Sequence, residues 1–245
     1  MEWKTEIAKS SKEETLIRGY NILEMIDKLT FTEAIYLVLK GVLPTKKETR
    51  MLDSIFVSSI EHGINPPSTM VARIIASCGT DFNDSLAAGL LAIGKNHGGA
   101  VEQSARILQE DINKPSSEIV REARVQKKKI SGYGHRIYAI DPRAQKILSI
   151  AKELGFYGKY VKKALEIEAE LEKQTGKKIY LNIDGAVATV ISEMGFDWRV
   201  AQAFFIIPRI VGLSAHVHEE LLQNNSYRRL DEEETLYLGK SNKKL

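Results

Sequence analysis

Three short segments of this chain place ionisable side chains directly beside glycine. They are residues 96–99 (Asn-His-Gly-Gly), residues 132–143 (which begin Gly-Tyr-Gly-His and end Asp-Pro-Arg) and residues 182–185 (Asn-Ile-Asp-Gly). Glycine lets the backbone bend sharply and lets a ligand approach closely. Two histidines and one carboxylate can share the proton transfers of a carbon–carbon bond reaction near neutral pH. We therefore predict that the fold gathers these segments into one active site.

The composition is that of an ordinary globular protein, with 43% hydrophobic and 27% charged residues among 245. A net charge of +3 suits anionic small-molecule ligands and is too weak to indicate nucleic-acid binding. The one cysteine, Cys78, excludes an internal disulfide framework, and its setting of small residues predicts that it is buried.

The N-terminus has no apolar core of signal-peptide length. The longest apolar run, residues 201–213, is broken by Pro208 and Arg209 and is shorter than the ~18 residues of a membrane helix. We therefore expect a cytoplasmic protein that does not enter a membrane.

Most of the chain has helical periodicity, and an alternating strand pattern is absent. A capping box at Thr45–Glu48 predicts the start of one helix, and Asp141-Pro142 predicts the start of a second, which ends at Gly155. A third helix is predicted to start near Gly185, and Asp197 is predicted to cap a fourth. Pro208 is expected to kink or interrupt the helix that follows Asp197. The predicted fold class is all-α.

Each motif also has a structural interpretation when it is taken alone. His97 can be a loop histidine bonded to the backbone, and Asp184 can be the N-cap of its helix. His135 gains specificity from Arg143, which follows eight residues later at a helix start.

Taken together, the segments resemble the citrate synthase superfamily, in their order and along nearly the whole chain. Residues 61–65 (Glu-His-Gly-Ile-Asn) resemble the first histidine motif of that family, residues 96–100 the second and residues 132–143 the third. Residues 181–184 resemble the motif around the catalytic aspartate, and residues 208–216 resemble the helix that carries an anion-binding arginine.

Two segments, residues 181–185 and residues 226–230 (Ser-Tyr-Arg-Arg-Leu), are more similar to citryl-CoA lyases and to the lyase module of ATP-citrate lyase. The chain also begins close to the family's core. It contains no glycine-rich phosphate loop, so a lyase of this kind would receive citryl-CoA from a separate citryl-CoA synthetase.

The resemblance implies the cleavage of citryl-CoA into acetyl-CoA and oxaloacetate. His135 would take the proton of the tertiary hydroxyl, His97 would stabilise the enolate oxygen, and Asp184 in its acid form would protonate the enolate carbon. By the same resemblance, the carboxylates of the citrate moiety would be bound by His62, Arg143 and Arg209. A further contact would come from one of Arg228 and Arg229, reaching the site of a neighbouring subunit. His62 is followed by glycine, where the family more often has glutamate, so its role is less secure.

Coenzyme A is expected as part of substrate and product, without a tightly bound cofactor. Gly132 and Gly134 would let the backbone approach its adenine or pantetheine, while residues 127–129 (Lys-Lys-Lys) either meet its phosphates or form a solvated run. We expect no metal, because His216 and His218 would point to different faces of a helix.

The family fold implies a large helical domain from residues 1–99 and 204–245, and a small helical domain from residues 100–203. It also implies a homo-oligomer, either a dimer or a tetramer. Two alternatives to the lyase remain: a citrate synthase-type enzyme that condenses acetyl-CoA with oxaloacetate, and a non-catalytic partner of a citryl-CoA synthetase.

Overall fold

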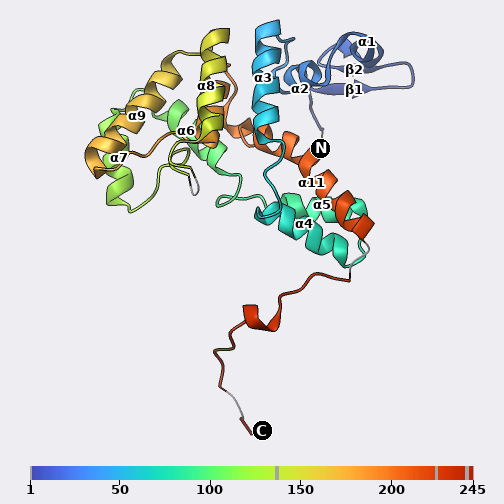
Figure 1. The fold of residues 1–245 in the computed structure, drawn as a ribbon. Coiled ribbons are helices and arrows are strands. Elements are labelled where there is room, and N and C mark those ends of the chain that lie inside the picture. The colour runs from blue at the N-terminus through green and yellow to red at the C-terminus, as the bar shows by residue number, and fades with distance from the viewer. Residues whose placement is uncertain (1, 136–137, 224–225, 241–242, 245) are drawn as a thin grey trace. The chain divides into compact units, whose positions relative to one another are not determined.

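The computed structural model describes residues 2–135, 138–223, 226–240 and 243–244, and these are mainly helical (Figure 1). The α-helices, in chain order, are α1 (Ile22–Lys28), α2 (Phe31–Lys40), α3 (Lys46–Ser59), α4 (Pro67–Ser77), α5 (Phe82–Leu91), α6 (Ala100–Glu110), α7 (Ser116–Val125), α8 (Pro142–Leu154), α9 (Lys159–Thr175), α10 (Ile183–Glu193) and α11 (Ala203–Gln223). Two 3-10 helices, η1 (Trp198–Val200) and η2 (Glu232–Glu234), complete the helical elements. The predicted all-α class is confirmed.

A small antiparallel sheet near the N-terminus was not expected. Its strands are β1 (Ala8–Ser10), β2 (Thr15–Ile17) and β3 (Tyr20–Asn21), in the order β1-β2-β3. The strands are two or three residues long, and β1 is exposed. They are too short to show an alternating apolar pattern, which is the feature that identifies strands in a sequence.

The chain forms two compact units, which are described separately. The larger unit contains residues 1–61 and 94–209, and the smaller unit contains residues 62–93 and 210–245. These bounds differ from the predicted domains at 1–99, 100–203 and 204–245, and that division stays a prediction. The predicted catalytic residues His97, His135 and Asp184 all belong to the larger unit.

Helix α10 is the centre of the larger unit. Eight consecutive residues, 185–192, are buried, and α6, α8 and α9 pack around the helix. Figure 1 shows α7 beside α9 at the edge of this group. An aromatic cluster completes the core, with ring centroids 5.3 Å apart for Tyr36 and Phe196 and 4.8 Å apart for Phe196 and Phe204.

Several predicted helix boundaries are confirmed. Thr45 and Glu48 form the capping box of α3. Asp141 caps α8, which ends at Gly155 in the left-handed conformation that glycine adopts readily. Asp197 caps η1. Helix α11, by contrast, is not interrupted, because it continues through Pro208.

Helix α4 packs against α5 in the smaller unit. Gly89 permits this contact, since a Cβ atom there would lie 2.9 Å from the Cβ of Ala72. Ala72 and Ala76 of α4 form a small core with Leu213 and Val217 of α11. Cys78, at the C-terminal end of α4, is exposed, so its predicted burial is wrong: it follows the last turn of the helix and lies outside this core.

Among the described residues, one helical stretch, Trp198–Gln223, is long and apolar enough to cross a membrane by length and composition alone. No such stretch was expected from the sequence, because Pro208 and Arg209 interrupt the apolar run of residues 201–213. However, 44% of its apolar window is buried inside the protein, and it carries the buried charged residues Arg209 and Glu220. These features are typical of a core helix.

The residues before α10 pair with the Gly-Tyr-Gly-His loop. Tyr133 and Leu181 form an isolated antiparallel bridge. The N–H of Gly134 donates to the carbonyl of Tyr180 (2.8 Å), and the N–H of Asn182 donates to the carbonyl of Gly132 (2.9 Å). A Cβ atom on Gly185 would lie 2.3 Å from the carbonyl oxygen of Gly132, and one on Gly132 would lie 2.8 Å from the Cα of Gly185. The two backbones are therefore in direct contact.

This contact makes Gly185→Ala a sensitive test of the arrangement. Gly185 lies in a helix with ordinary backbone angles, so the added methyl group causes overpacking, with an expected cost of about 3 kcal/mol in the free energy of unfolding. Gly176→Ala is the control, because Gly176 has φ +70° and open space around it. An added methyl group there meets no other atom, so the free energy of unfolding should fall only by the about 1–2 kcal/mol that a left-handed backbone costs a residue with a side chain. Chemical denaturation measures both; a Gly185→Ala variant as stable as Gly176→Ala would contradict the contact.

Candidate active site

The first turn of α10 carries Asp184, and Asn182 holds that turn in place. The Oδ1 of Asn182 accepts a hydrogen bond from the N–H of Gly185 (3.1 Å) and caps the helix. Its Nδ2 donates to the carbonyl of Gly134 (2.7 Å). One side chain thus caps α10 and fixes the Gly-Tyr-Gly-His loop. Asp184 is not the N-cap, so its carboxyl group is not committed to capping.

Asp141 connects the start of α8 to the same turn. Its buried carboxylate accepts hydrogen bonds from the Nε (3.1 Å), Nη2 (2.9 Å) and backbone N–H (3.0 Å) of Arg143, and from the N–H of Ile183 (3.1 Å). Burial by itself raises the pKa of Asp141, but these bonds outweigh it and lower the pKa below its usual value. Asp141 therefore positions the guanidinium of Arg143 beside α10. From the sequence, Asp141 was predicted only as a helix cap.

His135 extends from the loop toward Arg143. Its Nε2 lies 3.4 Å from Nη2 of Arg143, and its Nδ1 accepts a hydrogen bond from the N–H of Tyr138 (3.1 Å). The neighbouring residues Arg136 and Ile137 lie outside the described residues.

His97 lies in a tight turn after α5. The backbone of His97 exchanges two hydrogen bonds with Gly94 (2.8 and 2.9 Å), and Gly98 follows with φ +81°. The imidazole packs edge-on against Phe205, with centroids 6.0 Å apart. Burial, and secondly the positive charge of Arg209, lower the pKa of His97. The ring is therefore neutral at physiological pH and can donate a hydrogen bond without carrying charge.

Arg209 is buried in the part of α11 that belongs to the larger unit, with 3% of its surface exposed. Its Nε donates to the carbonyl of Ser59 (3.1 Å), and its guanidinium lies 4.8 Å from the centroid of Phe205. Burial lowers the pKa of Arg209, while the charges of Glu61 and Asp184 oppose that shift. The group stays positive because the ordinary pKa of arginine is so high.

Asp184 lies among these groups. The side chain keeps some accessible surface, but protein atoms surround it on most sides, and this desolvation raises the pKa of Asp184. The charges of Arg143, Arg209 and His135 oppose the rise, whereas the negative charge of Asp141 adds to it. The acid form of Asp184 therefore persists to a higher pH than in an exposed aspartate.

The structure thus gathers five of the predicted site residues in the larger unit: His97, His135, Arg143, Asp184 and Arg209. Gly132 and Gly134 form the loop that pairs with the segment before α10. His62, Arg228 and Arg229 belong to the smaller unit, where all three are exposed. The roles assigned to all of these residues stay predictions.

A groove of about 520 Å³ begins at Gly134 and His135. Its walls combine apolar side chains, such as Ile130 and Ile179, with the basic residues Arg124, Lys128 and Lys129. The groove therefore suits a long ligand that has both apolar and anionic parts. Among the described residues, no cluster of three or more His, Cys, Asp or Glu side chains is arranged to hold a metal ion.

Comparisons with known proteins identify the family to which this chain belongs. Residues 46–230 match the family described as "Citrate synthase, C-terminal domain". The peroxisomal citrate synthase of Dictyostelium discoideum is 33% identical over 231 residues, which are 89% of this chain and 45% of that protein. The chain therefore belongs to the citrate synthase family. It spans about half the length of the curated relatives it matches.

Two solved structures relate the fold to lyases. Citryl-CoA lyase from Hydrogenobacter thermophilus is 48% identical with a TM-score of 0.94, and the match covers 99% of this chain and 97% of that one. ATP citrate lyase from Methanothrix soehngenii has a TM-score of 0.85 at 23% identity, covering 98% of this chain and 42% of that one. The second match shows the fold alone.

The raised pKa of Asp184 predicts the effect of Asp184→Asn on stability. A carboxyl whose folded pKa is raised destabilises the protein increasingly as the pH rises above its unfolded pKa. The neutral amide removes this cost, so we expect the variant to melt about 2–4 °C above the wild type at about pH 8, with a smaller gain at about pH 5. A variant that melts below the wild type at the higher pH would show that the ionised carboxylate is stabilised here.

Proposed function

We propose that this protein is a citryl-CoA lyase. The observation that carries the proposal is the 48% identity to citryl-CoA lyase from Hydrogenobacter thermophilus over nearly the full length of both chains. The protonation states favoured in the larger unit agree with it, because cleavage needs an uncharged donor for the enolate oxygen and an acid for the enolate carbon.

The reaction is a retro-Claisen cleavage. The tertiary hydroxyl of citryl-CoA loses its proton to Nε2 of His135, and the carbon that bears this oxygen becomes the ketone of oxaloacetate. The carbon–carbon bond breaks, and its electron pair forms the enolate of acetyl-CoA. His97 donates a hydrogen bond to the enolate oxygen. Asp184 gives its proton to the enolate carbon, which yields acetyl-CoA.

His135 must change its hydrogen bonding for this role. Both ring nitrogens face donors, because Nδ1 accepts from the N–H of Tyr138 and Nε2 lies 3.4 Å from Nη2 of Arg143, which can only donate. A neutral imidazole accepts a hydrogen bond at only one nitrogen. For cleavage Nε2 must be the acceptor and Nδ1 must carry the ring proton, so the bond from Tyr138 has to be released when substrate binds.

Arg143 and Arg209 are proposed to bind carboxylates of the citrate moiety, because a planar guanidinium can donate two hydrogen bonds to one carboxylate. His62 is proposed to contribute contacts to the same moiety. The groove beside His135 is proposed to hold coenzyme A, with Arg124, Lys128 and Lys129 near its phosphates. This interpretation favours the ligand-binding role of the lysine run over a purely solvated one.

A homo-oligomer, a cytoplasmic location and a separate citryl-CoA synthetase complete the proposal. They rest on the family resemblance and on the expectations from the sequence. Coenzyme A acts here as part of substrate and product, without a tightly bound cofactor.

The second candidate is a citrate synthase. It is favoured by the curated relatives, which carry that name at 28–34% identity. Synthase and lyase share the carbon–carbon step and differ in whether the thioester of citryl-CoA is hydrolysed.

Supplying citryl-CoA to the purified protein and following two products separates the candidates. Oxaloacetate is measured by coupled reduction to malate, and free coenzyme A by a thiol reagent. The lyase predicts oxaloacetate without free thiol. Free thiol together with citrate would identify a synthase, and binding without either product would identify a non-catalytic partner.

Asp141→Asn tests the positioning of Arg143 and the acid role of Asp184 together. Asparagine still caps a helix, so we expect the fold to be retained. Loss of the charge that raises the pKa of Asp184 should move the basic limb of the kcat–pH profile to lower pH, because the acid form is lost earlier. KM should rise by about tenfold as Arg143 is released.

The control for Asp141→Asn is Arg121→Leu, which removes an exposed arginine whose ion pair with Glu118 is 3.6 Å long. Such surface pairs contribute little, so its KM and pH profile should match the wild type. An Asp141→Asn variant with the wild-type profile would contradict the coupling between Asp141 and Asp184.

A further inference from the structure

Helix α6 begins in direct contact with the His97 turn, which comprises residues 94–99. Gly99 is the N-cap of α6, and its N–H donates to the carbonyl of Gly94 (3.0 Å). A Cβ atom on Gly99 would lie 2.8 Å from that carbonyl oxygen. The first turn of α6 is therefore tied to the segment that holds the candidate oxyanion donor His97.

The same helix supports the Gly-Tyr-Gly-His loop. A Cβ atom on Gly132 would lie 2.6 Å from Oγ of Ser104, which is a buried residue of α6. Ser131, the residue before the loop, donates a hydrogen bond from Oγ to Oε1 of Gln103 (2.7 Å). Two consecutive residues of α6 thus contact the start of the loop that carries His135.

Gln103 also reaches the His97 turn, because its Nε2 donates to the carbonyl of Lys95 (3.3 Å). The two partners fix the orientation of the amide. A backbone carbonyl can only accept a hydrogen bond, so Nε2 faces Lys95 and Oε1 accepts from the hydroxyl of Ser131. One half-buried side chain therefore bonds to both histidine-bearing segments.

We propose that Gln103 is a positioning residue that holds the His97 turn and the Gly-Tyr-Gly-His loop in a fixed relative position, and so sets the separation of His97 from His135. This inference rests on the proposed function, in which the two imidazoles act on two oxygen atoms of one citryl-CoA molecule. Gln103 acts through these residues and does not touch the substrate.

The physical reason is the glycine content of both segments. Gly94, Gly98 and Gly99 lie in the His97 turn, and Gly132 and Gly134 lie in the loop. Glycine gives a backbone more conformational freedom than any other residue, so each segment needs an external bond to stay in place. Precise placement is required, because a displacement of about 1 Å at a reacting group can lower a rate about a hundredfold.

Gln103→Met is the first test, because methionine has a similar length and forms neither hydrogen bond. With citryl-CoA as substrate, kcat should fall by about tenfold or more while KM stays close to the wild-type value, since the interaction lost is not a contact with substrate. Burial lowers the pKa of His97 in the wild type. In the variant that pKa, measured by nuclear magnetic resonance, should move toward its ordinary value as the turn loosens and admits water.

Gln109→Met is the matched control within the same helix. The side chain of Gln109 bonds to three groups: Oγ of Ser192 (2.9 Å), the carbonyl of Phe196 (2.9 Å) and the N–H of Trp198 (3.0 Å). These partners lie outside the His97 turn and the loop. The control should lower the melting temperature at least as much as Gln103→Met, yet keep the wild-type kcat and the wild-type pKa of His97.

Gln103→Glu separates the two bonds, because a carboxylate still accepts from Ser131 but cannot donate to Lys95. Hydrogen–deuterium exchange should accelerate at the amides of the His97 turn and stay slow at Gly134, whose N–H reports on the loop. Ser131→Ala should have the opposite pattern. In the Gln103→Met background, Ser131→Ala should have little further effect on kcat, because its partner is already absent.

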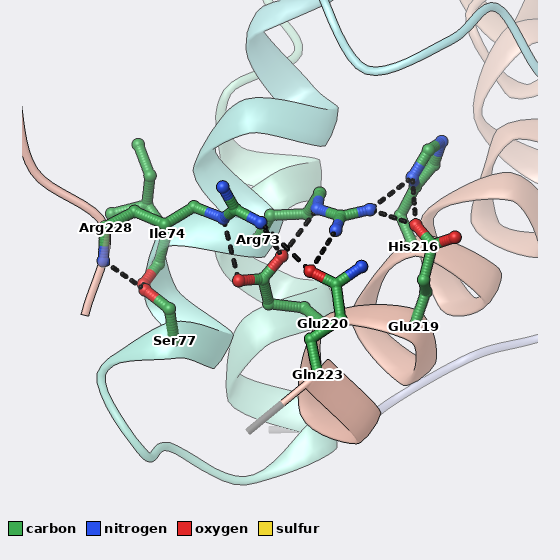
Figure 2. Close-up of polar contacts among 8 residues, drawn as sticks. All are labelled: Arg73, Ile74, Ser77, His216, Glu219, Glu220, Gln223 and Arg228. Carbon is green, nitrogen blue, oxygen red and sulfur yellow. Dashed lines mark hydrogen bonds and ion pairs between the residues drawn. The ribbon is translucent and has the colours of Figure 1, made fainter. Parts of the chain in front are cut away.

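Ser77→Ala is the control for Ser131→Ala. The Oγ of Ser77 accepts from the N–H of Arg228 (2.9 Å) and donates to the carbonyl of Ile74 (2.7 Å), beside a network of charged side chains in the smaller unit (Figure 2). This variant also removes a hydroxyl that makes a long-range hydrogen bond. It should leave the exchange of the His97 turn and of the loop unchanged.

Three results would overturn the proposal: unchanged exchange of both segments in Gln103→Met, a wild-type kcat in that variant, or an equal loss of kcat in Gln109→Met. The exchange measurements do not depend on turnover. A wild-type protein that fails to cleave citryl-CoA would contradict the lyase proposal, while exchange would still decide whether Gln103 holds the two segments.

Discussion

The direct contact between the backbones of Gly132 and Gly185 is the constraint on which the candidate site depends. It brings the Gly-Tyr-Gly-His loop against the first turn of the buried helix α10. A side chain at either position would separate the two segments. With them in contact, Asn182 reaches the loop while it caps the helix, and His135 and Asp184 come from different parts of the chain into one site.

Burial then favours the protonation states that the proposed chemistry needs, because it shifts the pKa of an acid and of a base in opposite directions. Removing water disfavours charge, so it raises the pKa of Asp184 and lowers the pKa of His97. The positive charge of Arg209 acts in the same direction as burial on His97, but against burial on Asp184. Desolvation thus favours the neutral form of both groups, the imidazole of His97 and the carboxylic acid of Asp184.

Local signals predicted much of the fold, and long-range contacts account for what was missed. Thr45 with Glu48, and Asp141 with Gly155, mark helix ends through chemistry within one turn, so the sequence reveals them. The bonds from Asp141 to Arg143 and Ile183 depend on packing between α8 and α10, which no local pattern encodes. The same is true of the bond from Asn182 to the carbonyl of Gly134. The sequence indicated Asp184 as a possible cap, whereas the structure has Asn182 in that role. Glycine beside ionisable residues indicated the candidate segments, because the close backbone approach at Gly132 and Gly185 leaves no room for a side chain.

The placement of Arg143 resolves a conflict within the site. In the proposed reaction a substrate carboxylate needs a cation nearby, yet a cation free to pair with Asp184 would stabilise the carboxylate form and remove the acid that the proposed cleavage requires. Asp141 competes for this cation by accepting two side-chain hydrogen bonds from Arg143, although the charge of Arg143 still lowers the pKa of Asp184. The negative charge of Asp141 itself raises the pKa of Asp184. Arg143 is therefore held beside the site, while the charge of Asp141 favours the acid form of Asp184. The buried Asp141 thus acts on two neighbouring groups at once, on Arg143 through hydrogen bonds and on Asp184 through its charge.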